Sequence, residues 1–385
     1  MIQKADRLND VQEYYFSKKL REVAELKSKG KPVINIAIGS PDLQPAPSVI
    51  AALNSASQLD SAHGYQSYQG IPALRLGISD FYKVNYNVEL NANSEVLPLM
   101  GSKEGIMHIS MAFLNKGDKV LIPNPGYPTY TSVTKLVEAE PVFYNLTEDT
   151  NWLPNFQEIE KEDLNNVKIM WINYPHMPTG AVASKEDFEQ LIAFAKKHEI
   201  LIVNDNPYSF ILNKNPQSIL AIEGAKEVAI ELNSLSKTFS MAGWRVGMVV
   251  GNAEILNIIL QVKSNMDSGM FLGIQKGAVE ALKLSTSWFK KQDEIYTRRR
   301  AVVWKIFDAL DCTYDTTIGG LFVWAKLPAG KKSEEFTDVL LYENDVFITP
   351  GTIFGSNGEG YIRASLCVSE VVLEEVLTRL IPINS

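Results

Sequence analysis

The feature that most constrains the fold is a series of seven short apolar runs between about residue 96 and residue 250. Longer segments of helical period separate these runs, as expected for a mostly parallel sheet whose strands are joined by helices. Several runs are apolar at successive positions, which strands buried on both faces require. The predicted strands span residues 96–100, 119–122, 141–144, 167–173, 200–205, 228–232 and 246–250.

Helices must cover both faces of such a sheet. The segment after Ser102 places Ile106, Ile109 and Phe113 at helical spacing, and residues 186–197 carry apolar side chains at the same period. Both segments are predicted to be covering helices. The expected fold class is α/β, with a three-layer α/β/α large domain around a sheet of about seven strands.

The length of the chain points to a second domain. Single cores stop growing at roughly 250–300 residues, and this chain has 385. After a charged helical stretch that contains Arg298, strand-like runs follow at 320–327 and 346–349. We predict a large domain over residues 40–275 and a smaller α+β domain built from both chain ends, residues 1–39 and 276–385.

Composition excludes several classes of function. Hydrophobic residues make up 45% and charged residues 21%, which is ordinary for a soluble globular protein. The net charge of -8 argues against a nucleic-acid surface, which needs a basic face. Two cysteines, Cys312 and Cys367, are too few for a disulfide framework or a zinc site built on cysteine pairs.

The amino terminus lacks the apolar region of a secretory signal, and no stretch of about 18 apolar residues occurs. We therefore expect a cytoplasmic protein that does not act on membranes. The histidines at 63, 108, 176 and 198 lack metal-ligand spacing, so no catalytic metal is expected.

Polar residues follow two of the predicted strands, where ligands bind in open α/β sheets. The strand at 96–100 is followed by Gly101, Ser102 and Lys103 and then a helix. Such a helix start either binds an anion or is an ordinary capped end. The strand at 200–205 ends in Asp205, with Tyr208 close behind, which places a carboxylate and a phenol at the sheet edge or marks a plain turn.

The strongest local feature is a lysine among hydroxyl groups between two predicted strands. Ser234-Leu235-Ser236-Lys237 is followed eight residues later by Arg245. A lysine that is desolvated or held near other cations loses its proton and attacks carbonyl groups. A solvated loop lysine is the competing interpretation from these residues alone.

These motifs, in this order, resemble the class I/II aminotransferases of the fold-type I pyridoxal-phosphate (PLP) enzymes. The resemblance covers nearly the whole chain, and the block from Ser234 to Arg245 is its most specific part. The chain is most similar to the subgroup of alanine, aromatic, methionine and diaminopimelate aminotransferases. The resemblance implies transfer of an amino group from an L-amino acid to a 2-oxo acid by ping-pong kinetics.

The resemblance also implies roles for residues around the PLP ring. Lys237 would hold PLP as a Schiff base and then shuttle the proton between the substrate Cα and the cofactor C4′. Asp205 would pair with the protonated pyridine nitrogen, and Tyr208 would donate a hydrogen bond to O3′. Tyr127, in Pro-Gly-Tyr-Pro, would stack on the ring face.

Further roles concern the cofactor phosphate. The implied contacts are Ser102, the Lys103 backbone amide, Ser234, Ser236 and Arg245, whose guanidinium makes charge-assisted bonds. Tyr65 matches a family tyrosine that reaches the phosphate of the neighbouring subunit. A homodimer with shared sites is therefore implied.

The substrate carboxylate has its own implied partners. Arg363 matches the arginine that grips the α-carboxylate, and Gly39 lies where the family closes over the substrate. The substrate itself is not identified, because no arginine stands out as a partner for a second carboxylate.

Two other functions remain open. A PLP-dependent C-S lyase or related elimination enzyme would share this framework, and its products would be pyruvate and ammonia. A regulator that borrowed the fold would need an added DNA-binding segment, and the residues before Gly39 are too few for a winged helix.

One departure from the family concerns O3′. The family usually has Asn-Pro-Thr-Gly, with the asparagine donating to O3′, whereas this chain has Met177-Pro178-Thr179-Gly180. A thioether cannot donate a hydrogen bond. Tyr208 then becomes the main O3′ partner, unless Asn173 or His176 takes that place.

The departure leads to a prediction about Met177→Asn. In the wild-type enzyme, the cofactor O3′ lacks the hydrogen bond that the family asparagine would donate. The wild-type Schiff base should therefore keep its proton to a higher pH than the Schiff base of the variant. Absorbance titration of the two holoenzymes measures this pH. Identical titration curves would contradict the hypothesis.

Overall fold

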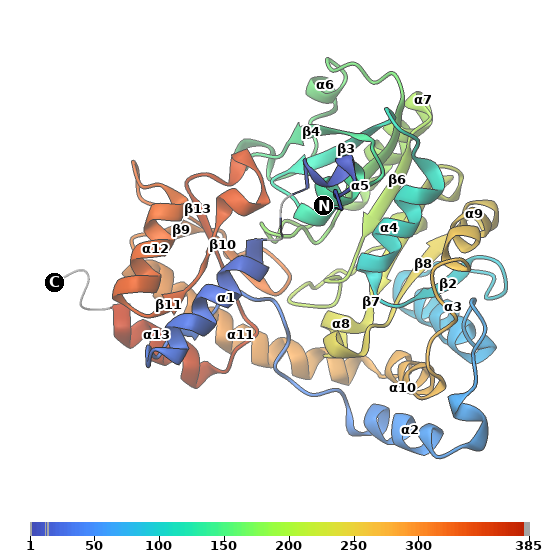
Figure 1. The fold of residues 1–385 in the computed structure, drawn as a ribbon, viewed down its shortest axis with the longest axis horizontal. Helices are drawn as coiled ribbons and strands as arrows, with labels where there is room; N and C mark the ends of the chain where they lie inside the picture. The colour runs from blue at the N-terminus through green and yellow to red at the C-terminus, as the bar shows by residue number, and fades with distance from the viewer. Residues whose placement is uncertain (1, 12, 14, 381–385) are drawn as a thin grey trace.

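Seven strands form the central sheet of the computed structural model, which describes residues 2–11, 13 and 15–380 (Figure 1). Their order is β2-β8-β7-β6-β5-β3-β4. Strand β8 runs antiparallel to β2 and β7, and the other pairs are parallel. The strands are β2 (Val96–Leu99), β3 (Lys119–Asn124), β4 (Glu140–Asn145), β5 (Val167–Ile172), β6 (Leu201–Asp205), β7 (Ala229–Ser234) and β8 (Gly247–Gly251).

Helices cover both faces of this sheet, because both faces are apolar. Leu97 and Leu99 belong to one buried cluster, and Val96 belongs to another on the opposite face. The first cluster includes residues of α4 (Ser102–Phe113), α5 (Pro128–Leu136) and α9 (Ala253–Lys263). The second includes α2 (Pro47–Ser57), α3 (Pro72–Tyr86), α7 (Lys185–His198) and α10 (Leu272–Leu282). The predicted three-layer α/β/α arrangement is confirmed.

Two smaller sheets lie beside the central one, and the second of them joins the two ends of the chain. One is antiparallel, in the order β12-β13-β10-β9, and the other pairs β1 with β11 in parallel. Their strands are β1 (Ile34–Asn35), β9 (Thr313–Tyr314), β10 (Phe322–Lys326), β11 (Val346–Phe347), β12 (Thr349–Pro350) and β13 (Tyr361–Ser365). The helices beside them are α1 (Tyr15–Ser28), α11 (Thr286–Ala309), α12 (Ser333–Glu343) and α13 (Glu370–Leu380). The smaller α+β part is therefore present, while the boundaries at residues 39 and 275 stay predictions.

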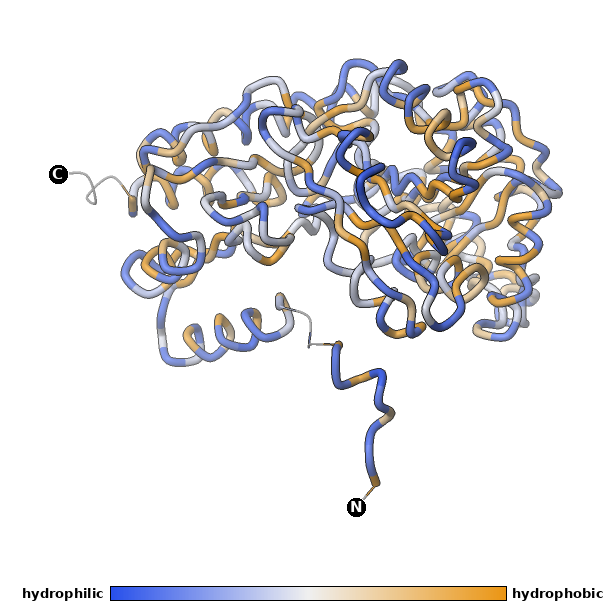
Figure 2. The backbone as a smooth tube through the Cα atoms, turned by 90° about the horizontal axis from the view of Figure 1, so that it is seen from above, coloured by the Kyte–Doolittle hydropathy of each residue, from blue (hydrophilic) through white to orange (hydrophobic). Residues whose placement is uncertain are grey.

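Helix α1 packs on this smaller part. Its Phe16 and Val23 share a buried cluster with Leu341 and Phe347. The other side of α1 is rich in charged residues, so hydrophobic and hydrophilic colours alternate within each of its turns in Figure 2. This packing places the first turns of α1 beside the carboxyl ends of the central strands.

In the part of the chain that the structure describes, no helix is both long enough and apolar enough to cross a membrane. Two short α-helices complete the fold, α6 (Phe156–Ile159) and α8 (Leu235–Thr238). The second of them follows β7 directly and carries Lys237.

Candidate active site

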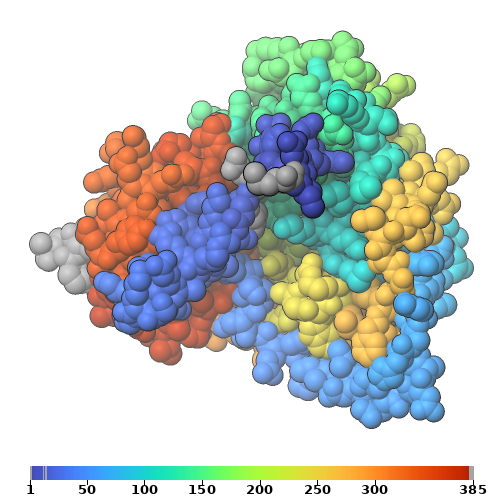
Figure 3. All heavy atoms as spheres, viewed as in Figure 1, coloured from blue at the N-terminus to red at the C-terminus, as the bar shows by residue number. Residues whose placement is uncertain are grey.

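A cavity of about 520 Å³ lies where β6 and β7 end, between the central sheet and the smaller part. The molecular surface is hollowed there, between α1 and α8 (Figure 3). Its lining includes the following residues predicted from the sequence: Gly39, Ser102, Lys103, Tyr127, Asp205, Tyr208, Ser234, Ser236, Lys237, Arg245 and Arg363. Tyr65 is not part of this lining and is 94% exposed.

The Lys237 side chain points into this cavity from α8. Ser234 caps the start of this helix, because its Oγ accepts a hydrogen bond from the Ser236 backbone N–H at 3.1 Å. The Lys237 Nζ donates to the carbonyl of Gly39. Burial lowers the pKa of Lys237, and the nearby guanidinium of Arg363 lowers it further. The amine is thus prepared to act as a nucleophile.

Asp205 ends β6 and is buried, with 5% exposure. Its Oδ2 accepts a hydrogen bond from the Tyr130 hydroxyl at 3.0 Å, whereas its Oδ1 has no partner within the described chain. Burial raises the pKa of this carboxyl to about 6, although the Tyr130 bond opposes the shift. A buried acceptor of this kind suits a cationic N–H donor on a ligand.

Tyr130 was missed in the sequence. Its ring stacks on Trp171, with centroids 4.9 Å apart and planes 7° apart. It lies in the first turn of α5, three residues after the N-cap Tyr127, and the two ring centroids are 5.5 Å apart. That spacing in Pro-Gly-Tyr-Pro-Thr-Tyr was the available signal.

An anion site forms at the start of α4. Gly101 has a φ of 91°, a backbone conformation that strains any other residue, and a Cβ there would also lie 2.1 Å from the Arg245 Nη2. A Cβ at Gly247 would lie 2.7 Å from the backbone nitrogen of Ser102. The Arg245 guanidinium and the positive end of the α4 dipole therefore lie close together.

Arg363 is held firmly on β13, where it is 3% exposed. Its Nη2 donates to the carbonyl of Ala37 at 2.8 Å, and its Nη1 donates to the Met177 sulfur at 3.2 Å. The guanidinium carbon lies 3.8 Å from the centre of the Phe322 ring. A fixed cation at the cavity wall can bind a carboxylate.

The backbone loop that carries Gly39 is also fixed. Asp42 accepts two hydrogen bonds from Arg299 of α11, at 2.6 and 2.8 Å. Arg299 donates a further bond to the carbonyl of Leu366 at 2.9 Å. The bidentate pair ties the loop to the helix that crosses between the two parts of the chain.

Asn173 and His176, the two alternatives to Tyr208 as an O3′ donor, both have other polar partners within the protein. Asn173 lines the cavity, but its Nδ2 donates to the Asp205 carbonyl and its Oδ1 accepts from the Met177 N–H at 2.7 Å. His176 lies 2.8 Å from the Thr179 hydroxyl, and burial lowers its pKa to about 3. Burial also raises the pKa of Tyr208, which keeps its phenol protonated as a donor.

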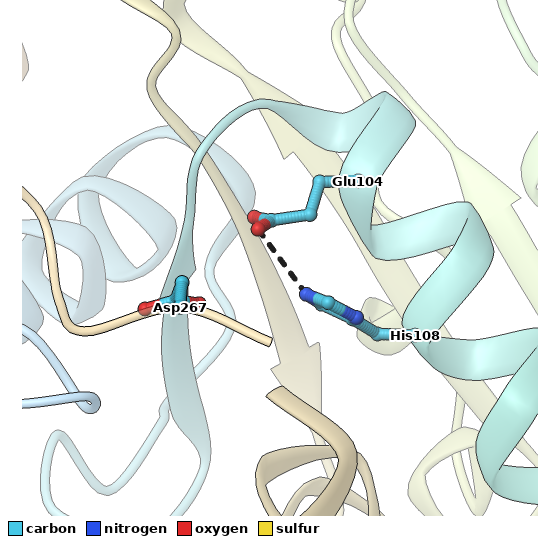
Figure 4. A group of neighbouring side chains, drawn as sticks. All are labelled: Glu104, His108 and Asp267. Carbon is cyan, nitrogen blue, oxygen red and sulfur yellow. Dashed lines mark ion pairs between the residues drawn. The ribbon is translucent and has the colours of Figure 1, made fainter. Parts of the chain in front are cut away.

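A cluster of titratable groups lies behind the anion site (Figure 4). Ligand atoms of Glu104, His108 and Asp267 lie within 4.8 Å of one another. Both Asp267 oxygens accept hydrogen bonds from the Lys263 ammonium, at 2.9 and 2.7 Å, in a nearly buried ion pair. A metal ion would have to compete with this ammonium for Asp267.

Comparison with known proteins connects this geometry to a family. The description "Aminotransferase class I and II" belongs to the family profile that matches residues 31–380. An LL-diaminopimelate aminotransferase of Dehalococcoides mccartyi is 40% identical over 97% of both chains. One of Maridesulfovibrio salexigens is 41% identical over 98% of both.

Solved structures of related proteins have the same fold over nearly the whole chain. Substrate-bound BacF from Bacillus subtilis has a TM-score of 0.95 at 35% identity and covers 100% of this chain and 98% of its own. An aminotransferase from Staphylococcus aureus has a TM-score of 0.90 at 32% identity, with 99% of both chains covered. The chain therefore belongs to the class I and II aminotransferase family, as a PLP-dependent aminotransferase.

Proposed function

We propose that Lys237 carries the transfer of an amino group from an L-amino acid to a 2-oxo acid in this enzyme, by a ping-pong mechanism. The observation that supports this role most directly is the charge pattern of the cavity. The unpartnered Asp205 oxygen and the anion site with Arg245 belong to different parts of its lining. PLP has the matching charges, a cationic ring nitrogen and an anionic phosphate.

PLP supplies a carbonyl group that condenses with amines and a ring that withdraws electrons from the substrate Cα. Lys237 Nζ takes the proton from the substrate Cα and delivers it to the cofactor C4′. Asp205 keeps the ring nitrogen protonated, and Tyr208 donates to O3′. Tyr127 lies against the ring face.

The phosphate contacts proposed are Ser102, the Lys103 backbone amide, Ser234, Ser236 and Arg245. Arg363 orients the substrate through its α-carboxylate, and the loop at Gly39 encloses it. The hydrogen bonds of Arg363 to Ala37 and Met177 support this role because they fix the guanidinium before substrate arrives.

We further propose a homodimer in the cytoplasm, with Tyr65 reaching the phosphate of the partner subunit. Two exposed tyrosines support an interface at this segment, Tyr65 at 94% and Tyr68 at 45% exposure. The curated relatives are named for LL-diaminopimelate, so a role in amino-acid biosynthesis is part of the proposal.

Replacement of Lys237 by alanine tests the central role. The variant should lose both the visible absorbance of the bound cofactor and turnover, because no other amine takes the place of its Nζ. Lys290→Ala, an exposed lysine on α11, is the matched control and should behave as wild type. Retained transamination in Lys237→Ala would overturn the assignment.

The products distinguish transfer from elimination. Wild-type enzyme without acceptor should release one equivalent of 2-oxo acid per site and no ammonia. Continuous release of pyruvate and ammonia from an amino acid with a β-leaving group would instead identify an elimination enzyme.

Tyr130→Phe tests how Asp205 is kept ionised. Loss of the Tyr130 bond removes a contribution that lowers the Asp205 pKa, so the carboxylate should protonate at higher pH. A protonated Asp205 cannot pair with the cationic ring nitrogen. We expect the variant to bind PLP about tenfold more weakly at pH 6, since a hydrogen bond to a charged group contributes roughly 1.5–3 kcal/mol, and nearer to wild type at pH 8.

Equilibrium dialysis of PLP at both pH values measures this effect. Tyr144→Phe is the control, because the Tyr144 hydroxyl is also buried but donates to the backbone carbonyl of Trp171 at 2.8 Å. A loss of PLP affinity in Tyr130→Phe that is equal at pH 6 and pH 8 would contradict the proposed role.

A further inference from the structure

Some of the cavity lining has no part in the proposed roles of Lys237 and Arg363, on which this inference rests, and can receive the substrate side chain. Those two residues fix the amine and the carboxylate, and the cofactor lies toward Asp205. The opposite side is formed by the start of α1 and two loops. We call it the distal wall, and its members are Phe16, Ser17, Leu20, Ile38 and Phe354.

The distal wall is apolar and begins beside the carboxylate site. The Arg363 guanidinium carbon lies 4.7 Å from the centre of the Phe354 ring and 5.9 Å from that of Phe16. Leu20, one turn further along α1, is 40% exposed and borders the same cavity. Apart from the Ser17 hydroxyl, the wall offers only hydrocarbon surface to a substrate side chain.

The lysines and arginines of the cavity lining have other roles. They are Lys103, Lys237, Arg245 and Arg363. Lys103 follows Ser102 in the first turn of α4, at the helix start that forms the anion site, and burial together with the charge of Arg245 lowers its pKa. Among the described lining residues, the distal wall therefore offers no lysine or arginine to a second carboxylate on the substrate.

The segments that accompany Tyr65 in the proposed dimer are also without lysine or arginine. In the proposed dimer, the segments beside Tyr65 enter the partner's site with it. Residues 264–271 adjoin that segment, because a Cβ at Gly269 would lie 2.5 Å from the Gln66 carbonyl. Neither residues 65–70 nor residues 264–271 contain a lysine or arginine. Their exposed large side chains are Tyr65, Tyr68, Met266 and Phe271.

We propose that the amino donor carries an apolar side chain, preferably aromatic, and not a second carboxylate. This inference rests on the proposed aminotransferase site and concerns only its specificity. An apolar side chain buries its surface on Phe16, Leu20 and Phe354, whereas a distal carboxylate loses water without gaining a partner. The named activity of the curated relatives would then not be the preferred reaction of this chain.

Single-turnover rates on the PLP-loaded dimer test the proposal without an acceptor. The donors are L-phenylalanine, L-leucine, L-glutamate and LL-diaminopimelate. We expect the rate per donor concentration to be at least tenfold higher for phenylalanine than for either dicarboxylic donor, on the order of what pocket contacts discriminate. Faster reaction of a dicarboxylic donor would overturn the inference but leave the proposed function standing. No reaction with any donor would contradict the proposed function itself.

Binding of unreactive analogues gives a readout that does not depend on turnover. Titration calorimetry should show 3-phenylpropionate binding more tightly than glutarate, and the reverse order would contradict the inference. Leu20→Arg places a cation on the distal wall and should raise glutarate affinity relative to 3-phenylpropionate.

Two further variants serve as controls. Leu20→Gln separates charge from the loss of apolar surface, and Leu76→Arg puts the same cation on an exposed leucine of α3. Neither variant should raise the affinity for glutarate relative to 3-phenylpropionate as Leu20→Arg does. An unchanged ratio in Leu20→Arg would show that Leu20 is not next to the substrate side chain.

Discussion

A buried carboxylate with one unpartnered oxygen is the constraint on which the site depends. Asp205 lies at the end of a central strand, where desolvation penalises its charge, and Tyr130 compensates only one of its oxygens. Such a group is stabilised when a ligand brings a cationic donor. Elsewhere in the cavity lining, Arg245 and the helix start at Ser102 favour an anion. The cavity thus selects a ligand with separated charges of opposite sign.

The rest of the fold brings distant parts of the chain to this cavity. The sheet supplies Asp205 and the segment around Lys237, while the two chain ends supply Gly39 and Arg363. The Asp42–Arg299 pair and the parallel pairing of β1 with β11 hold these ends together. The enclosure of substrate therefore depends on contacts between residues some 300 positions apart, and not on one local motif.

The sequence predicted the central sheet well for a physical reason. Strands buried on both faces must be continuous apolar runs, and each of the seven runs corresponds to an observed strand, including the partly exposed edge strand β4. It did not predict β1 or β9, because strands of two residues have no period to detect, and it missed β13, where Arg363 interrupts the apolar pattern. The smaller sheets owe their pairing to tertiary contacts that no local pattern encodes.

In the candidate site, too, local motifs could be predicted from the sequence, whereas contacts between distant segments could not. Motifs at strand ends predicted most of the lining, because each lies in a short stretch with its own polar signature. The Tyr130–Asp205 bond, the contact between Met177 and Arg363 and the distal wall on α1 join segments far apart in sequence. Those contacts determine how Asp205 is tuned and which side chains the cavity accepts.

The most direct test of the central claim is to identify the lysine that binds PLP. Reduction of the PLP-loaded enzyme with borohydride, followed by proteolysis and mass spectrometry, fixes the cofactor on its lysine. The account predicts one modified peptide, the one that contains Lys237. Modification of Lys103 or another lysine, with Lys237 unmodified, would contradict it.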